Sequence, residues 1–264
     1  MYSNGGIYIP DRKPPLGAVR NPYLAINRGL VLDAMMSEGA GNTVADLSGN
    51  GNIGTLVDGA HWVAGKFGSC LEFDGDGDSV TIPDSSSLDV STAVTISCRF
   101  KTSIGDSRLL HKNASFYVEV RFGGNLRIYT AGLSDTTMDG SGGVTDGIWH
   151  NVAFTYDGAK KTIYIDGVFD ASEAATGSIT NTVNPVLIAI NHVGTSDFTG
   201  PIDLPMIYNR DLSASEIQQL YREPFCGYRW ESIIELASYV AGGGESSVAK
   251  IMQQMNQFNG GQAA

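Results

Sequence analysis

The run from Asp46 to Asn52 is the segment of this sequence whose residue types are best suited to hold a metal ion. It reads Asp-Leu-Ser-Gly-Asn-Gly-Asn, and a tight turn of this kind presents side-chain and backbone oxygens to one point. Ca²⁺ takes about six to eight such oxygen ligands. We therefore expect Asp46, Asn50 and Asn52 to bind calcium or, as the alternative, to hydrogen-bond their own turn as Asp and Asn often do.

Five polar and aromatic residues on consecutive predicted strands form a second candidate site, this time for a sugar. They are Arg108, His111, Tyr117, Arg121 and Tyr129. Sugar binding needs aromatic rings for stacking and polar groups at the rim of the site. The polar outer face of any antiparallel sheet has a similar composition, so the sequence leaves both a glycan site and an ordinary solvent-exposed face open.

The sequence shows no clear pattern of catalytic residues. Glucanases bring two carboxylates together on a sugar, and no predicted strand here carries a row of alternating acids. Glu72 and Glu119 each stand alone in their strands, and the 4 His residues are scattered without the spacing of a nucleophile or metal site. We expect Trp62, Trp149 and His150 to have structural roles, the two Trp residues in the core. We thus predict a protein that is not an enzyme.

The charge balance excludes one large class of partners. The chain has 264 residues, with 28 Asp and Glu against 17 Lys and Arg, and a net charge of −11. Phosphate binding needs clustered Lys and Arg, so nucleic acid is not expected as the main ligand. The start, MYSNGGIYIPDRKPP, lacks the apolar core of a signal peptide, and no later stretch is long and apolar enough to span a bilayer. We expect synthesis in the cytoplasm without membrane insertion.

The cysteine pattern argues against a disulfide framework. The chain has 3 cysteines, Cys70, Cys98 and Cys226, whereas disulfide frameworks use even numbers of cysteines in secreted chains. Cys70 and Cys98 fall in alternating patterns that turn their side chains inward. We expect both to serve as small buried apolar groups.

The elements that must position these residues are mainly short β-strands. The chain contains 33 glycines, and from residue 29 to residue 225 β-rich runs alternate with clusters of Gly, Asn, Asp and Ser. The run Thr95–Phe100 alternates strictly, as a strand with one buried face should. Thr155–Ile165 is predicted to form a hairpin around Asp157-Gly158. Many strands without intervening helices predict an all-β fold, a two-sheet antiparallel sandwich.

Both ends of the chain differ from this central region. Residues 1–28 contain four prolines and are predicted to form an extended basic arm. This arm either docks on its own domain or on a neighbouring copy, or is simply solvated. Residues 226–264 are predicted to form a helical extension with a Gly-Gly-Gly hinge. Four apolar residues there recur at the spacing of a two-turn coiled-coil seam, which suits either subunit contacts or packing on the sandwich. They are Val248, Ile251, Met255 and Phe258.

Four segments in order resemble the laminin-G-like, concanavalin-A-like jelly-roll family. They are VADLSGNGNIGTL, GKFGSCLEFDGDGDSVTIPDSSSLDV, DGIWHNVAFTYDGAKKTIYIDG and IDLPMIYNRDLSASEIQQLY, the last being a strand that runs into a short, Ser-capped helix. The resemblance implies a jelly-roll sandwich over residues 29–225. It also implies that Asp46 meets Asp203 of the closing strand across a calcium ion. The family usually places Glu after that Asp, whereas here Leu204 and Pro205 follow, and Pro205 indicates a strand edge or a bulge.

The resemblance further implies a function in assembly or recognition. Chains with a Pro-rich leader, the entry NRGLV and the exit LYREPF look like virion-associated proteins of bacteriophages. We therefore expect a non-enzymatic structural or recognition subunit on the surface of a virion or another extracellular assembly. It would decorate a capsid, tail or fibre and self-associate or bind other subunits. The first alternative is a calcium-dependent carbohydrate-binding module that binds surface glycans, and the second is a glycoside hydrolase.

Overall fold

The computed structural model describes residues 12–14 and 17–228. These residues belong to one compact unit, which includes Lys13 and Arg20 of the predicted arm and the short 3-10 helix η1 (Ala25–Asn27). The predicted seam of the C-terminal extension lies outside the described residues: Val248, Ile251, Met255 and Phe258. Its part in self-association stays a prediction.

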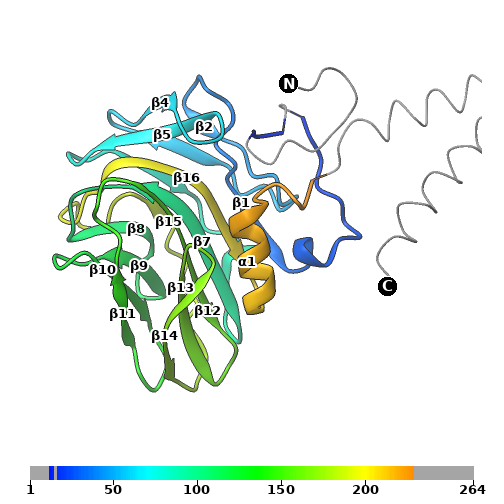
Figure 1. The fold of residues 1–264 in the computed structure, drawn as a ribbon, viewed down its shortest axis with the longest axis vertical. Helices are drawn as coiled ribbons and strands as arrows, with labels where there is room; N and C mark the ends of the chain where they lie inside the picture. The colour runs from blue at the N-terminus through cyan, green and yellow to red at the C-terminus, as the bar shows by residue number, and fades with distance from the viewer. Residues whose placement is uncertain (1–11, 15–16, 229–264) are drawn as a thin grey trace, which may run out of the picture. The chain divides into compact units, whose positions relative to one another are not determined.

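Two eight-stranded antiparallel sheets make up the fold of the described residues (Figure 1). The first sheet has the order β14-β13-β12-β7-β16-β5-β4, and β1 pairs with β16 beside this path. Its strands are β1 (Leu30–Asp33), β4 (His61–Ala64), β5 (Ser69–Asp74), β7 (Val94–Lys101), β12 (Trp149–Tyr156), β13 (Lys160–Ile165), β14 (Val168–Ala174) and β16 (Thr199–Tyr208).

The second sheet has the order β11-β10-β9-β8-β15-β6-β3-β2. Its strands are β2 (Thr43–Val44), β3 (Gly54–Val57), β6 (Ser79–Ile82), β8 (Ser107–Lys112), β9 (Phe116–Val120), β10 (Asn125–Thr130), β11 (Thr137–Gly143) and β15 (Val186–Ile188), and the 3-10 helix η2 (Ser86–Leu88) follows β6. The predicted two-sheet antiparallel sandwich is confirmed. The predicted hairpin around Asp157-Gly158 is also confirmed, since it joins β12 to β13.

The hydrophobic core lies between the two sheets. Side chains alternate across a strand, so in β10 Leu126 and Ile128 are buried while Tyr129 is half-buried on the outer face. Phe100 and Phe154 of the first sheet belong to the same core cluster as these two residues. Burying each such side chain stabilises the fold by about 1.5–3 kcal/mol.

Strand β7 is buried on both faces, which corrects the prediction of a single buried face. Thr95, Ser97 and Arg99 alternate with its apolar residues, yet their exposed fractions are 0%, 2% and 2%. The chain that follows β16 covers Thr95 and Arg99. Thr95 Oγ1 donates to Arg210 O at 2.8 Å, and Arg99 Nη2 donates to Tyr221 O at 2.5 Å.

A second apolar cluster lies on the outer face of the first sheet, under helix α1 (Ala214–Arg222) (Figure 1). Ile217 and Leu220 of the helix pack in this cluster with Tyr208 of β16. The predicted Ser cap is confirmed as Ser213. Its Oγ accepts a hydrogen bond from Glu216 N at 3.3 Å, and Glu216 Oε2 accepts one from Ser213 N at 2.9 Å. This reciprocal pair is a capping box, which satisfies two backbone N–H groups at the helix start.

Replacing Ser213 by alanine removes the cap. We expect the variant to lose about 1 kcal/mol of unfolding free energy, because Glu216 N then loses its acceptor. Chemical denaturation measures the loss. Ser213→Asn is the matched control, since Asn caps helices as well as Ser does and should keep the stability of the wild type. Equal stability of all three proteins would contradict a role for this cap.

The closing strand β16 carries a bulge in place of a regular ladder. Its register with β7 shifts between Asp203 and Met206, and Leu204 lies in the left-handed region with φ 52°. Pro205 has no N–H to give to a ladder, but its carbonyl accepts from Ala34 N at 2.9 Å. The predicted bulge is confirmed, and it lies in a central strand of the sheet rather than at an edge.

The described part of the basic arm docks on its own domain. Arg20 is 8% exposed, and its Nε donates to Asp33 Oδ2 at 2.6 Å. Tyr228 also donates its hydroxyl to Asp33 Oδ2, and the Arg20 guanidinium lies 4.5 Å from the centre of the Tyr228 ring. Asn21 N donates to Gly227 O at 2.8 Å. The described part of the arm is therefore bound non-covalently to the segment that follows α1.

Cys70 and Cys98 are free thiols with exposed fractions of 0% and 1%, as predicted. His150 is also structural, as expected, because Asp166 and Asp146 bind its two ring nitrogens at 2.8 and 3.1 Å. The prediction that Trp149 lies in the core is wrong. Trp149 is half-buried and lines a groove on the molecular surface. No helix among the described residues is long and apolar enough to cross a membrane.

Candidate functional site

Four strands at one end of the second sheet, β8 to β11, carry most of the predicted sugar-binding residues on one face. The face is the outer one, because the residues between them, such as Val118 and Ile128, are buried in the core. We call it the tyrosine face. It consists of Arg108 and His111 on β8, Tyr117 and Glu119 on β9, Arg127 and Tyr129 on β10, and Thr137 and Asp139 on β11.

The first row of the tyrosine face is aromatic. Strand register aligns His111, Tyr117, Tyr129 and Thr137 across the four strands. The rings of Tyr117 and Tyr129 stack with their centres 4.9 Å apart and their planes 10° from parallel. The ring of His111 meets Tyr117 at 6.0 Å and 80°. Such cross-strand aromatic pairs stabilise a sheet by about 0.2–1 kcal/mol, and they hold the rings in fixed orientations.

The second row of the tyrosine face alternates in charge. Register aligns Arg108, Glu119, Arg127 and Asp139. Arg108 forms an ion pair with Glu119, and Arg127 Nε lies 4.0 Å from Glu119 Oε1. Arg127 donates two hydrogen bonds to Asp139, from Nε at 2.6 Å and from Nη2 at 2.8 Å. The bond from Arg127 lowers the pKa of Asp139, so this carboxylate is ionised at neutral pH. The row is a fixed series of charged donors and acceptors.

The two rows contact each other at Tyr117 and His111. The Arg108 guanidinium lies 3.5 Å from the centre of the Tyr117 ring. Burial, Arg108 and His192 together lower the pKa of His111 to about 4, so His111 is neutral at pH 7. Its Nδ1 accepts a hydrogen bond from His192 N at 3.2 Å, which places the proton of the neutral ring on Nε2. The neutral ring of His111 is 4% exposed and packs against Tyr117, so it supports the stacked tyrosines from within the face.

The structure brings together four of the five residues predicted from the sequence: Arg108, His111, Tyr117 and Tyr129. The fifth, Arg121, follows β9 at the turn into β10 and acts electrostatically on Asp139. Sequence reasoning missed Glu119, Arg127 and Asp139. The signal for the first two was present, since they lie two residues from Tyr117 and Tyr129 and so on the same face of their strands.

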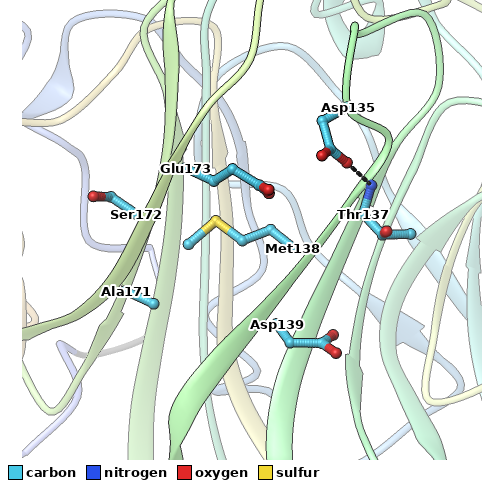
Figure 2. Close-up of a pocket in the computed structure, with 7 residues that line it drawn as sticks. All are labelled: Asp135, Thr137, Met138, Asp139, Ala171, Ser172 and Glu173. Atoms are coloured by element: carbon cyan, nitrogen blue, oxygen red, sulfur yellow. Dashed lines mark hydrogen bonds between the residues drawn. The ribbon is translucent and has the colours of Figure 1, made fainter.

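A pocket of about 380 Å³ adjoins the tyrosine face at the open edge of the sandwich, between β11 and β14 (Figure 2). It shares Thr137 and Asp139 with the face, and Figure 2 shows Asp135 and Glu173 on opposite sides of it. The remaining residues that line it are Met138, Ala171 and Ser172. Pockets of about 300–1,000 Å³ suit small ligands. The face and the pocket thus form one continuous surface.

The buried ammonium group of Lys161 lies behind the wall of this pocket and binds the backbone that forms it. Its side chain is fully buried, and Nζ donates to Asp135 O at 3.2 Å and to Thr137 O at 3.0 Å. Nζ also lies 3.4 Å from Glu173 Oε2. The pocket is therefore lined by acids whose negative charge is partly balanced by one buried amine.

The residues predicted to share a calcium ion lie in two separate hydrogen-bond networks. Both oxygens of Asp46 accept bonds within the first network, Oδ1 from the N–H groups of Asp33 and Ser48, and Oδ2 from Ser48 Oγ and Asn52 N. Asn50 Nδ2 donates to Leu30 O at 3.2 Å. Asp46 therefore holds its own turn, which is the alternative raised from the sequence.

Asn52 belongs to the network of Asp46, whereas Asp203 belongs to a second network with Lys13. Asn52 Nδ2 donates to Val31 O at 2.7 Å. Asp203 has an exposed fraction of 0%, and Lys13 Nζ donates to its Oδ1 at 2.5 Å. The described residues contain no group of three or more His, Cys, Asp and Glu that could hold a metal ion. These residues do not fit one shared ion in this arrangement, and calcium binding by the chain stays a prediction.

The fold and its sequence pattern match one known family. A model of the concanavalin A-like lectin/glucanases superfamily matches residues 74–218, which include β6 to β16, the tyrosine face and most of α1. This chain belongs to that superfamily. The closing strand and the capped helix are thus superfamily elements that the sequence resembled, whereas the bulge lies at Leu204 and Pro205, where the sequence departs from the usual pattern. No curated protein sequence matches the chain.

Solved structures similar to this superfamily member include binding domains. The binding domain of Paraclostridial Mosquitocidal Protein 1 matches with a TM-score of 0.63 and 19% identity, over 76% of this chain and 53% of that one. Domain 4 of AbnA, a GH43 extracellular arabinanase from Geobacillus stearothermophilus, was solved in complex with arabinotriose. It matches with a TM-score of 0.61 and 20% identity, over 73% of this chain and 98% of that domain.

The binding domain of botulinum neurotoxin serotype D also matches, with a TM-score of 0.59 and 14% identity over 76% of this chain. The chain spans about half the length of the two toxin binding domains, 53% and 52%. At these identities the likeness shows the shared fold.

Proposed function

We propose that this protein is a non-enzymatic recognition protein that binds carbohydrate on the tyrosine face. The observation that supports this best is the stacked pair Tyr117 and Tyr129, held beside a row of ion-paired arginines and carboxylates. Sugars present apolar C–H faces and a rim of hydroxyls. Aromatic rings stack against the first, and charged donors and acceptors with fixed positions hydrogen-bond the second.

The pre-organisation of this face adds to the proposal. Binding costs free energy when flexible side chains must become ordered, about 0.5–1.5 kcal/mol for each. Arg127 is already fixed by two bonds to Asp139, and Arg108 by Glu119 and the Tyr117 ring. A ligand that lies along this face would also reach the edge pocket through Thr137 and Asp139. The bound arabinotriose of the arabinanase domain indicates that the fold is suited to oligosaccharides.

A glycosidase is less well supported by the described residues. Glycoside hydrolysis uses two carboxyl groups, one of which keeps a proton as the acid. Glu119 is paired with Arg108, and Asp139 has a lowered pKa. The groove beside Trp149 contains Glu72, whose pKa burial raises, but Glu72 is the only carboxyl group among the residues that line that groove. Neither of these two places offers an acid and a second carboxylate together. The edge pocket does bring carboxylates together, but Asp139 is bound by Arg127 and Glu173 lies 3.4 Å from the Lys161 ammonium.

The setting in which the protein acts is part of the proposal. The resemblance of the leader, NRGLV and LYREPF segments to bacteriophage virion-associated proteins supports a place on a particle surface. On such a particle the protein would present the tyrosine face to glycans of a host surface. Self-association through the C-terminal extension would multiply weak single-site binding, since linked sites gain effective concentration.

Replacing Tyr129 by alanine tests the proposed site. We expect binding of the full chain to glycans on an array, and to arabinotriose by calorimetry, to weaken at least about tenfold, because a stacking surface worth about 1.4 kcal/mol or more is lost. Tyr23→Ala is the matched control, since Tyr23 is 82% exposed and lies in the arm away from the face. A wild-type chain that binds no glycan would refute the function. A Tyr129→Ala variant that binds like the wild type would refute the site.

A further inference from the structure

A groove of about 390 Å³ lies on the outer face of the first sheet, whereas the tyrosine face belongs to the second sheet. Strand register places Glu72 of β5 opposite Pro201 of β16, and Lys101 of β7 opposite Trp149 of β12. These four residues line the groove. Phe100, which precedes Lys101 along β7, is buried in the core, so the row faces away from the core. The groove is thus a cavity that the proposed carbohydrate site does not use.

The floor of the groove carries little side-chain volume, and its wall is fixed. Gly200 has φ 122°, and a Cβ atom there would meet Lys101 O at 2.2 Å, so this position requires glycine. Pro201 beside it adds only a compact ring. Thr102 Oγ1 donates a hydrogen bond to Thr199 O at 2.8 Å, which ties the end of β7 to the start of β16. The groove is therefore a pre-formed hollow.

Glu72 and Lys101 supply charges of opposite sign that the described part of the chain leaves uncommitted. Neither side chain forms a hydrogen bond or an ion pair with another described residue. Burial raises the pKa of Glu72, although the charges of His61 and Lys101 lower it, so a donor brought by a ligand would stabilise its carboxylate. β5 and β7 flank β16, and neighbouring strands lie about 4.7–4.9 Å apart. The two charged groups therefore stand about two strand spacings apart, on opposite sides of Pro201.

The remaining lining of the groove is largely apolar. Trp149 is half-buried, and Val63 and Ile104 lie in the same lining. Ile104 is 51% exposed, so it presents apolar surface at the mouth of the groove. An indole ring packs well against aliphatic or aromatic groups. The groove thus combines an anion, a cation and an apolar wall.

We propose that this groove binds a small zwitterionic ligand, a dipeptide with apolar side chains. Its α-ammonium group binds Glu72, its α-carboxylate binds Lys101, and its side chains contact Trp149. Two extended residues span at most about 7 Å, which suits two charged side chains that lean toward each other over Pro201. A neutral sugar has no charges to match this pair, so the ligand differs in class from the one proposed for the tyrosine face. The inference does not rest on carbohydrate binding.

Titration of the full chain with leucyl-leucine, followed by calorimetry and tryptophan fluorescence, tests the inference. We expect the wild type to bind with a Kd in the millimolar range or tighter. Glu72→Gln and Lys101→Met should each weaken binding at least about tenfold, because each removes a charged hydrogen-bond partner. Glu223→Gln and Lys160→Met are the matched controls, since both residues are exposed and lie outside the groove. They should bind like the wild type.

Blocked dipeptides assign each charge of the ligand to its partner. N-acetyl-leucyl-leucine has no ammonium group, so it should bind the wild type weakly and Glu72→Gln no worse. Leucyl-leucinamide has no carboxylate and should give the same pattern with Lys101→Met. Both variants should keep the Tm and the arabinotriose binding of the wild type, which separates this site from the tyrosine face. The proposal is overturned if leucyl-leucine does not bind at millimolar concentration, or if the two charge variants or the two blocked peptides bind as tightly as the unmodified pair.

Discussion

Replacing Asp33 by alanine is expected to destabilise the domain by about 3–5 kcal/mol, the usual cost of leaving one partner of a buried ion pair alone. Asp33 is 1% exposed and accepts hydrogen bonds from Arg20 Nε and from the Tyr228 hydroxyl. Without the carboxylate, the Arg20 guanidinium stays buried with its charge unpaired. A loss of this size is a large part of the 5–15 kcal/mol that stabilise a typical domain. Urea denaturation followed by circular dichroism measures it.

A double variant separates the loss of the ion pair from the loss of packing. Arg20→Met with Asp33→Leu replaces both charges by apolar side chains of similar length, and such replacements are often neutral or stabilising. We expect the double variant to be clearly more stable than Asp33→Ala. If Asp33→Ala unfolds at the same denaturant concentration as the wild type, the arm is not anchored through this pair.

The second large effect concerns pH. Burial raises the pKa of Asp203 to about 6, although Lys13, Leu204 N and Arg99 act to lower it. An unfolded Asp titrates near 3.8, so between about pH 4 and pH 6 the folded protein binds more protons than the unfolded one. Stability from this group is therefore complete below pH 4 and is lost as the pH rises through 6. The change is of order 3 kcal/mol for a shift of this size.

Comparison with Asp203→Asn isolates this titration from those of other carboxyl groups. We expect the unfolding free energy of the variant, relative to that of the wild type, to rise between pH 4 and pH 7, because only the wild type pays the growing cost of ionising a buried acid. Asp76→Asn, which removes an exposed carboxylate from the turn after β5, serves as the control. A constant difference across this pH range would mean that Asp203 titrates normally.

The fold could be predicted from the sequence because its signals are local. The alternating runs, the Asp157-Gly158 turn and the Ser213 cap each depend on residues within a few positions of one another. Pro205 likewise has no N–H to donate to a neighbouring strand, so its presence in the sequence predicted the bulge. The four segments that resemble the superfamily occur in the order typical of it, so their order predicted the topology.

The parts that could not be predicted depend on contacts between distant segments. The outer face of β7 reads as solvent-exposed because Thr95 and Arg99 are polar, yet the chain after β16 covers both. Lys13 and Asp203 are separated by 190 positions, and no local pattern connects a lysine in a Pro-rich arm to an acid in the last strand. The exposure of Trp149 could not be predicted either, because it depends on segments from other parts of the chain that line the same groove.

The tyrosine face could be predicted from the sequence only in part. Residues two apart on one strand share a face, so Tyr117 with Glu119 and Arg127 with Tyr129 were accessible from the sequence. Which residues lie opposite each other on neighbouring strands depends on the strand register. The register of β8 is irregular between Arg108 and Leu110. The ring stack and the row of alternating charges therefore emerge only when the strands are aligned.

The join between the arm and the segment after α1 has a mechanical consequence. Arg20 bridges to Tyr228 in an antiparallel contact, and Asn21 N bonds to Gly227 O, so the two segments that flank the sandwich are bound to each other. Tension applied along the polypeptide on both sides would load this junction and the contacts of Lys13 with Phe67 and Asp203 before the two sheets. The two sheets would carry force only after the junction parts, which shields the tyrosine face from strain transmitted along the chain.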